Sequence, residues 1–266
     1  MQREEEAPKV VVFDLDETLG SFSQLYRFWN LIKIYLNQPN LDNTYFYELI
    51  DLFPLFIRPK ILFLLQLIKK KKITKVCDYV MIYTNNNGPN EWANLIKSYF
   101  HYKLDYELFD KIIRAFKIDG KQIELCRSSY EKSFKDLINC TQLPINTKVC
   151  FLDDQQHNEM QHKNVVYINI EPYHYNAKYQ TMAYKFYNKF SNIFEKDSND
   201  FINYINLNTS KHNLNALNKS KIQKNIDLLL TYEIIKQIKI FFKSNKHRTH
   251  RNKKLYKANN TFKKKH

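Results

Sequence analysis

Short apolar runs alternate along much of the chain with segments in which apolar residues recur every three or four positions. The runs are rich in β-branched and aromatic residues, which is typical of buried strands, and the segments between them have the spacing of amphipathic helices. The pattern predicts strands at 9–13, 79–83, 112–116, 148–152 and 165–169, a short strand near 123–126, and helices at 59–70, 89–100 and 131–140.

This alternation of strands and helices predicts an α/β fold, a Rossmann-like sandwich in which helices cover both faces of a parallel sheet. We expect the domain to span 1–190, with a small helical insert at about 20–57. A helical extension over 191–242 and a basic, disordered tail over 243–266 are expected to follow it.

The extension divides into two patterns. Residues 197–220 are rich in Asn, Ser and Lys and predict a linker or mobile loop. Beyond it, apolar residues recur at helical spacing on one face, which predicts a helix docked on the domain: Ile222, Ile226, Leu229, Leu230, Ile234, Ile238 and Phe241.

Two of the predicted strands run directly into pairs of acids. Asp14 and Asp16 follow the first strand, and Asp153 and Asp154 follow the strand at 148–152. Ligands of open α/β sheets bind at the carboxyl ends of the strands, and carboxylates held there are costly unless a cation or a reaction needs them. Each pair taken alone is equally compatible with an acidic turn exposed to solvent.

Groups that suit a phosphate accompany these acids. Thr84 and Asn85 follow the strand at 79–83 and precede a helix, whose N-terminal N–H groups can hold phosphate oxygens.

The run Val10-Val11-Val12-Phe13-Asp14-Leu15-Asp16-Glu17-Thr18 resembles the first motif of the haloacid dehalogenase superfamily of phosphotransferases, and three further segments follow in that family's order. The resemblance implies that Asp14 is a nucleophile that forms an aspartyl-phosphate and that Asp16 is the general acid/base. It implies that Lys135 in the helix predicted at 131–140 balances the charge of nucleophile and phosphate, with Lys132 as a second candidate. In a chain this rich in lysine, an ordinary surface position is the alternative for both. The implied phosphate ligands are Thr18, Thr84, Asn85 and Lys135, and the implied ligands of a Mg²⁺ ion are Asp14, Asp16, Asp153 and Asp154.

Two segments narrow the resemblance to one branch. Ile57-Arg58-Pro59 and Phe134-Lys135-Asp136-Leu137 are similar to stretches of the phosphatases that act on the RNA polymerase II C-terminal domain and of their nuclear-LIM-interactor-like relatives. This implies a phosphoserine or phosphothreonine protein as the substrate. Two alternatives stay open: a phosphatase of nucleic-acid ends, nucleotides or other small phosphomonoesters, and a catalytically silent scaffold that binds nucleic acid.

Charge is distributed unevenly along the 266 residues. The chain has 42 Lys and Arg against 27 Asp and Glu, a net charge of +15, yet no acid follows Glu233 while 12 of the basic residues do. Such a tail can hold nucleic acid non-specifically, because neutralised phosphates release counterions. A nuclear targeting signal, a segment that binds an anionic membrane surface and a purely solubilising segment are the other interpretations.

The cysteines Cys77, Cys126, Cys140 and Cys150 lack the paired spacing of a zinc site or disulfide framework, so ordinary thiols in a reducing compartment are expected. No apolar run is long enough to span a membrane, and the acidic N-terminus lacks a signal-peptide pattern. We therefore expect an intracellular protein of the cytoplasm or nucleus. The abundance of Asn, Lys and Ile indicates an A/T-rich genome, such as that of a parasite or a large DNA virus, and a virion or viral factory is the expected location in the second case.

Overall fold

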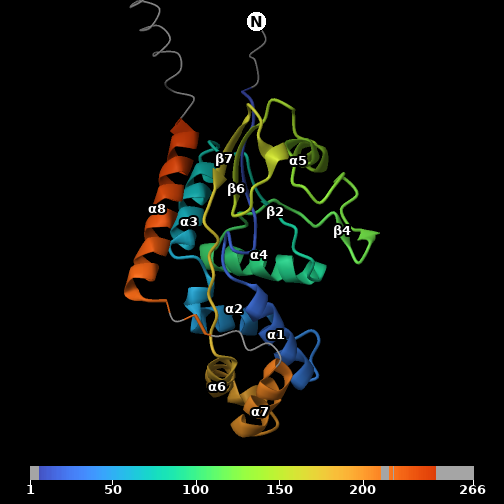
Figure 1. Ribbon diagram of the computed structural model, residues 1–266, viewed down its shortest axis with the longest axis vertical. Coiled ribbons are helices and arrows are strands. Elements are labelled where there is room, and N and C mark those ends of the chain that lie inside the picture. Colours follow the sequence, from blue (N-terminus) through green and yellow to red (C-terminus); the bar gives the residue numbers. More distant parts are fainter. Residues whose placement is uncertain (1–5, 211–215, 218, 244–266) are drawn as a thin grey trace, which may run out of the picture.

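Five parallel strands form the central sheet of the computed structural model, in the order β3-β2-β1-β6-β7 (Figure 1). The strands are β1 Lys9–Phe13, β2 Tyr79–Tyr83, β3 Lys111–Ile113, β6 Lys148–Asp153 and β7 Val165–Asn169. β1 lies at the centre, where Val10 is paired with Tyr79 on one side and Val149 on the other. The parallel sheet and its flanking helices confirm the predicted α/β class. The structure describes residues 6–210, 216–217 and 219–243.

Both faces of the sheet are covered. The elements that flank it are α3 Ile61–Ile73, α4 Asn90–Leu104, α5 Phe134–Thr141, the 3-10 turn η2 Asn158–Met160 and α8 Lys221–Lys243. Val11 and Phe13 of β1 pack into a larger core with α3, α4 and α8, while Val10 and Val12 pack on the opposite face against α5. The side chains of residues 10–13 are completely buried on one face of the sheet or the other, which explains why this part of β1 is apolar without interruption.

The residues after β1 and the residues after β7 build one helical layer beyond the carboxyl ends of the strands, at the bottom of Figure 1. Its elements are α1 Ser23–Tyr35, α2 Asn43–Leu52, the 3-10 turn η1 Pro54–Phe56, α6 Tyr179–Lys189, the 3-10 turn η3 Ser191–Ile193 and α7 Ser198–Thr209. Gln24 of α1 joins the two parts, because its amide donates to and accepts from the backbone of Ala177, both at 2.8 Å.

The linker predicted at 197–220 is wrong over its first half, which forms α7. Asp197 caps this helix by accepting a hydrogen bond from the N–H of Asp200 at 3.0 Å. Phe201 and Ile205 are completely buried in the larger core. Burial of these two side chains outweighs the weak helix propensity of the surrounding Asn residues, as packing of an amphipathic face generally does.

α8 confirms the predicted docked helix only in its second half. Ile234, Ile238 and Phe241 are buried in the larger core, whereas Ile222 and Leu229 are 72% and 66% exposed. The tail from residue 244 onward lies outside the described residues. Within the part of the chain that the structure describes, no helix is both long and apolar enough to cross a bilayer.

A hairpin of β4 Lys117–Ile118 and β5 Lys121–Gln122 stands close to where a strand was predicted at 123–126. Its turn contains Asp119 and Gly120, whose φ angles of 49° and 77° are the positive values that a two-residue hairpin turn needs. The Asp-Gly pair was therefore the signal for this hairpin in the sequence.

Cys126 and Cys140 form a disulfide, which corrects the prediction that all four cysteines are ordinary thiols. Cys126 lies just after the hairpin, and Cys140 lies near the end of α5. The chain turns back between them, which brings the two cysteines together. Asn139 supports this approach by donating to the carbonyl oxygen of Cys126 at 2.6 Å. Because this disulfide depends on how the chain folds back between the two cysteines, it could not be recognised from their spacing in the sequence. Cys77 and Cys150 are free and buried.

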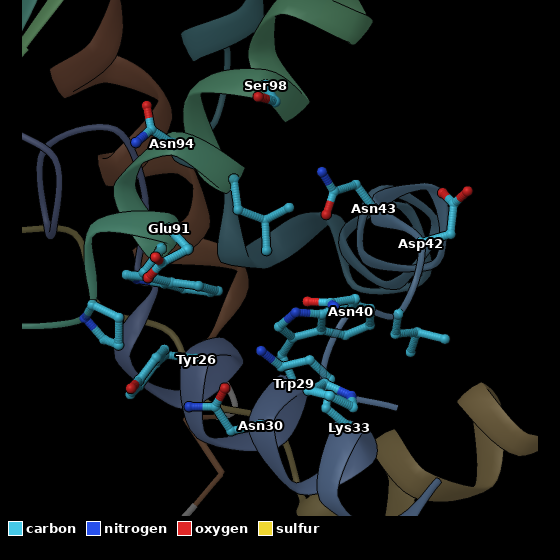
Figure 2. A pocket seen from close by; sticks show the side chains of 15 residues that line it. Tyr26, Trp29, Asn30, Lys33, Asn40, Asp42, Asn43, Glu91, Asn94 and Ser98 are labelled. Carbon is cyan, nitrogen blue, oxygen red and sulfur yellow. The ribbon is translucent and has the colours of Figure 1, made fainter. Parts of the chain in front are cut away.

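A groove of about 820 Å³ is lined by residues of the insert and of α4 (Figure 2). Tyr26, Trp29 and Asn30 of α1 lie on one side, α4 lies opposite, and residues 39–43 close a third side. The groove thus runs between the helical layer and the body of the sheet.

Candidate active site

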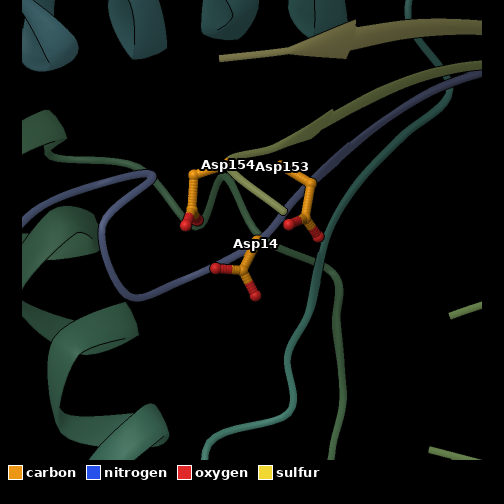
Figure 3. Close-up of side chains that lie close together, drawn as sticks. All are labelled: Asp14, Asp153 and Asp154. Atoms are coloured by element: carbon orange, nitrogen blue, oxygen red, sulfur yellow. The ribbon is translucent and has the colours of Figure 1, made fainter. Parts of the chain in front are cut away.

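Three carboxylates meet at the carboxyl edge of the sheet. Asp14 directly follows β1 and Asp153 ends the neighbouring strand β6, and the backbone N–H of Asp14 donates to the carbonyl oxygen of Leu152 at 2.8 Å. Asp154 points to the same place, so that one oxygen of each of the three acids lies within 4.8 Å of the others (Figure 3). Parallel pairing of β1 with β6 therefore brings Asp14 of the first acid pair beside both acids of the second.

The lysine that contacts these acids is Lys132, not the favoured Lys135. Its Nζ lies 2.5 Å from Asp14 Oδ1 and 2.7 Å from Asp153 Oδ2, and only 2% of its side chain is exposed. The side chain of Lys135 is exposed to solvent. The structure therefore corrects the predicted placement of the charge-balancing lysine.

The start of α5 explains this difference. The hydroxyl of Ser133 accepts a hydrogen bond from the N–H of Asp136 at 3.0 Å and caps the helix, which begins at residue 134. Lys132 thus belongs to the connection that leads into the helix and reaches the edge of the sheet. Lys135 belongs to the first helical turn, whose outer side is exposed.

Negative charge is in excess at this edge. Burial raises the pKa of Asp14 to about 7, with repulsion from Asp153 adding to it and Lys132 opposing it. Burial and repulsion from Asp153 likewise raise the pKa of Asp154. Burial disfavours the ammonium of Lys132, but attraction by Asp14 and Asp153 outweighs it and raises the pKa of Lys132. One ammonium therefore leaves part of the carboxyl charge unbalanced, which is the environment that favours a divalent cation.

Asp153 is the most firmly held of the acids. The N–H of Gln155 donates to its Oδ1 at 2.9 Å, and Nε2 of His157 lies 3.5 Å from its Oδ2. Burial disfavours the carboxylate, but contacts with His157 and Lys132 outweigh that effect and lower the pKa of Asp153. Asp153 therefore stays ionised at neutral pH.

Asp16 was predicted as a metal ligand but does not belong to the three-carboxylate cluster. Its Oδ2 accepts a hydrogen bond from Nδ2 of Asn86 at 2.5 Å, and its Oδ1 is buried without a hydrogen-bond partner. Burial raises the pKa of Asp16, although the bond from Asn86 opposes this. A carboxyl group with a raised pKa and one unpartnered oxygen is suited to give and take a proton.

Thr84 and Asn85 have different environments. The hydroxyl of Thr84 accepts a hydrogen bond from the N–H of Asn86 at 3.0 Å beside the site. The amide of Asn85 accepts from Nη1 of Arg127 at 2.7 Å and donates to the carbonyl oxygen of Tyr130 at 3.1 Å. The contacts of Asn85 therefore join the loop after β2 to the segment that carries Lys132.

The loop after β1 is braced from several sides. Thr18, a predicted phosphate ligand, donates its hydroxyl to Asp154 Oδ1 at 3.1 Å. Buried Arg58 donates to the carbonyl oxygens of Thr18 at 2.7 Å and Glu17 at 2.6 Å. At Gly20 a Cβ would lie 2.5 Å from a backbone oxygen of η1, so the close approach requires glycine. Together these contacts hold the loop in one conformation and so fix the direction in which Asp14 and Asp16 point.

A cavity of about 210 Å³ opens beside these groups and is lined by Asp14, Asp16, Thr84, Asn85, Lys132 and Asp153. Sequence reasoning missed the other lining residues, which are Glu17, Ser23, Asn86 and Gln155. Three of them directly adjoin a predicted site residue, which was the available signal. Ser23 opens α1 and has no such signal.

The fold and the site together define an α/β protein with a Rossmann-like parallel sheet, in which three carboxylates and one buried lysine share the carboxyl edge. Comparison of the chain with protein-family models, curated proteins and solved structures finds no match.

Proposed function

We propose that the chain is a Mg²⁺-dependent hydrolase of phosphate monoesters that acts through an aspartyl-phosphate on Asp14. The observation that carries this proposal is the buried ammonium of Lys132, which contacts Asp14 and Asp153 inside a cluster that includes Asp154. Buried carboxylates are costly unless they are paired or hold a metal. The order of motifs, which resembles that of the haloacid dehalogenase superfamily, supports the same function.

In this mechanism a carboxylate oxygen of Asp14 attacks phosphorus, and the bond from phosphorus to the ester oxygen breaks. Asp16 gives a proton to the leaving oxygen and later takes one from the water that attacks the aspartyl-phosphate. Its raised pKa and its unpartnered Oδ1 suit this role. Lys132 offsets the charge of the nucleophile and of the phosphate. The products are an alcohol and inorganic phosphate.

Asp14, Asp153 and Asp154 would hold the cation, because carboxylate oxygens are ligands that Mg²⁺ prefers. The raised pKa values of Asp14 and Asp154 fit this assignment, since both acids lack full charge compensation. When bound, Mg²⁺ supplies the positive charge that lets an anionic phosphate approach an anionic nucleophile. Thr18 keeps Asp154 in place for this contact.

For the substrate we propose a phosphoserine or phosphothreonine protein, on the resemblance of residues 57–59 to the polymerase-directed phosphatases. The resemblance at 134–137 no longer supports this, because Lys135 is exposed and Lys132 contacts the acids instead. The groove beside the insert supports this proposal, because it offers space for a large leaving group such as a protein segment. Ser23 lines the catalytic cavity, and Tyr26, one turn further along α1, lines the groove. A substrate with its phosphate at Asp14 can therefore extend between α1 and α4.

The test is turnover of a small aryl phosphate by the full chain with Mg²⁺. We expect Asp14→Asn to abolish it, because the amide keeps the shape of the carboxylate and loses the nucleophile. The matched control is Asp119→Asn in the exposed turn of the β4–β5 hairpin, which should retain turnover. Mass spectrometry after acid quenching should find phosphate on the peptide that contains Asp14. Wild-type turnover by Asp14→Asn would refute the proposal.

A further inference from the structure

The disulfide between Cys126 and Cys140 closes a loop of the chain that contains Lys132. The loop leaves Cys126, carries Lys132 across the edge of the sheet, and returns along α5 to Cys140. Because Lys132 contacts Asp14 and Asp153, the covalent link bounds the same segment that supplies the ammonium of the site.

Arg127 directly follows the first cysteine and ties the loop to the site. Its buried guanidinium donates to Asn85 Oδ1 at 2.7 Å, to the carbonyl oxygen of Arg114 at 2.8 Å and to that of Tyr130 at 3.0 Å. These contacts place the chain just before Lys132 against the loop after β2. Arg127 is adjacent in sequence to Cys126, so the S–S bond lies next to the contacts that hold the segment leading to Lys132.

The two ends of the loop meet at the disulfide. Cys126 is joined there to α5 by the S–S bond and by the hydrogen bond from Asn139 to its carbonyl oxygen at 2.6 Å. Further along, Ser128 is held to Asp136 by a hydrogen bond from its N–H at 2.9 Å. The start of α5 thus has support of its own, while at the Cys126 end the S–S bond acts together with the hydrogen bonds of Asn139 and Arg127.

We propose that the Cys126–Cys140 disulfide is a redox-sensitive element that keeps Lys132 on Asp14, so that reduction by a dithiol lowers the hydrolytic activity. This inference rests on the proposed function. Of the two cysteines Cys126 is the more accessible, since it is only partly buried and lies in an exposed stretch beside Leu125, whereas Cys140 is buried; we therefore expect a small reductant to attack Sγ of Cys126.

The reaction balances with a dithiol as the reductant. A thiolate of the reagent attacks Sγ of Cys126, the S–S bond breaks, and Sγ of Cys140 leaves with the electron pair and takes up a proton. The second thiolate of the reagent then attacks the mixed disulfide and releases Cys126, which also takes up a proton. The protein gains two electrons and two protons, and the reagent becomes a cyclic disulfide.

Reduction should leave β1 and β6 and the positions of their acids unchanged. It should make the position of Lys132 relative to Asp14 less fixed. Because a misplacement of about 1 Å can cost on the order of 10²-fold in rate, we expect kcat to fall between about tenfold and about a hundredfold. The effect should fall mainly on kcat, since Lys132 contacts the nucleophile rather than the groove that holds the leaving group.

The experiment compares turnover of a small aryl phosphate by the oxidised full chain before and after treatment with dithiothreitol, with thiols counted in both states. We expect the loss in kcat on reduction and its recovery on reoxidation. The double variant Cys126→Ser/Cys140→Ser should have the same reduced kcat as the reduced wild type, both with and without the dithiol. The matched control, Cys77→Ala/Cys150→Ala, removes the two free thiols and should keep the response.

Amide hydrogen exchange gives a second readout that needs no turnover. Exchange should rise on reduction over 126–133 and stay unchanged in β1 and β6. Unchanged kcat and exchange in a chain shown to be reduced would overturn the inference, and so would loss of protection throughout, which would mean that the disulfide supports the whole fold. An oxidised chain that hydrolyses nothing would instead count against the proposed function, while the exchange experiment would still test the loop.

Discussion

Replacing Lys132 by Met removes one positive charge from the carboxyl edge while keeping an unbranched side chain of similar length. The Nζ atom that is lost lies 2.5 Å from Asp14 and 2.7 Å from Asp153, at a position where 2% of the lysine side chain is exposed. The variant therefore leaves two buried carboxyl groups without their counter-ion.

Two magnitudes follow from this geometry. Breaking a buried ion pair by removing one partner costs about 3–5 kcal/mol when the remaining charge stays in place. Asp14 can relieve part of that cost by taking up a proton, since its pKa is already about 7 with Lys132 present. We therefore expect the loss of unfolding free energy near the lower end of that range. The loss of a preorganised charge at the reacting group should lower kcat by about 10²–10³-fold.

The pH dependence provides a sharper test. Asp14 attacks as a carboxylate, so activity should rise with pH as Asp14 ionises. Lys132 lowers the pKa of Asp14 by attraction, and its removal must raise that pKa. The acid limb of the pH–rate profile should therefore move to higher pH in Lys132→Met.

The assay measures kcat for a small aryl phosphate at saturating Mg²⁺ between about pH 5 and pH 9, together with thermal unfolding. Lys135→Met, which changes the same residue type on the exposed side of α5, is the matched control and should resemble the wild type in both. The reasoning is refuted if Lys135→Met loses more turnover than Lys132→Met, or if the acid limb of Lys132→Met moves to lower pH.

Three further outcomes are expected. Asp16→Asn should slow the hydrolysis by about 10²–10⁴-fold, the usual contribution of a general acid/base, and a wild-type rate in single-turnover kinetics would exclude that role. Chelation by EDTA should stop turnover, Mg²⁺ should restore it, and Ca²⁺ should inhibit, because its looser coordination misplaces the nucleophile; full activity in EDTA would exclude the metal-dependent mechanism. Deletion of 244–266 should leave turnover of a small aryl phosphate unchanged and weaken binding to duplex DNA. The affinity of the intact chain for DNA should fall as salt rises, with a log–log slope near −0.9 per phosphate neutralised. Binding that does not depend on salt would contradict this prediction.

The centre of the sheet could be predicted from the sequence because β1 and β6 are buried on both faces. β1 and β6 are continuous apolar runs, and both end in acids at the place where open α/β sheets bind ligands. α7 could not be recognised in this way, since its composition is that of a loop. The burial of Phe201 and Ile205 that stabilises it depends on packing in the larger core, which no local pattern reports.

The carboxylates of the site were predictable for the same topological reason, but the lysine was not. A resemblance to a short motif favoured Lys135, whereas the start of α5 decides for Lys132. That start did have a signal, because Ser133 and Asp136 have the spacing of a capping residue and an acid in the first helical turn. Knowing where the helix begins removes Lys132 from the helix. Its contact with Asp14 also depends on tertiary contacts such as that of Arg127 with Asn85, which hold the preceding segment against the loop after β2. Because these contacts join residues far apart in the sequence, no local pattern reports which of the two lysines reaches the acids.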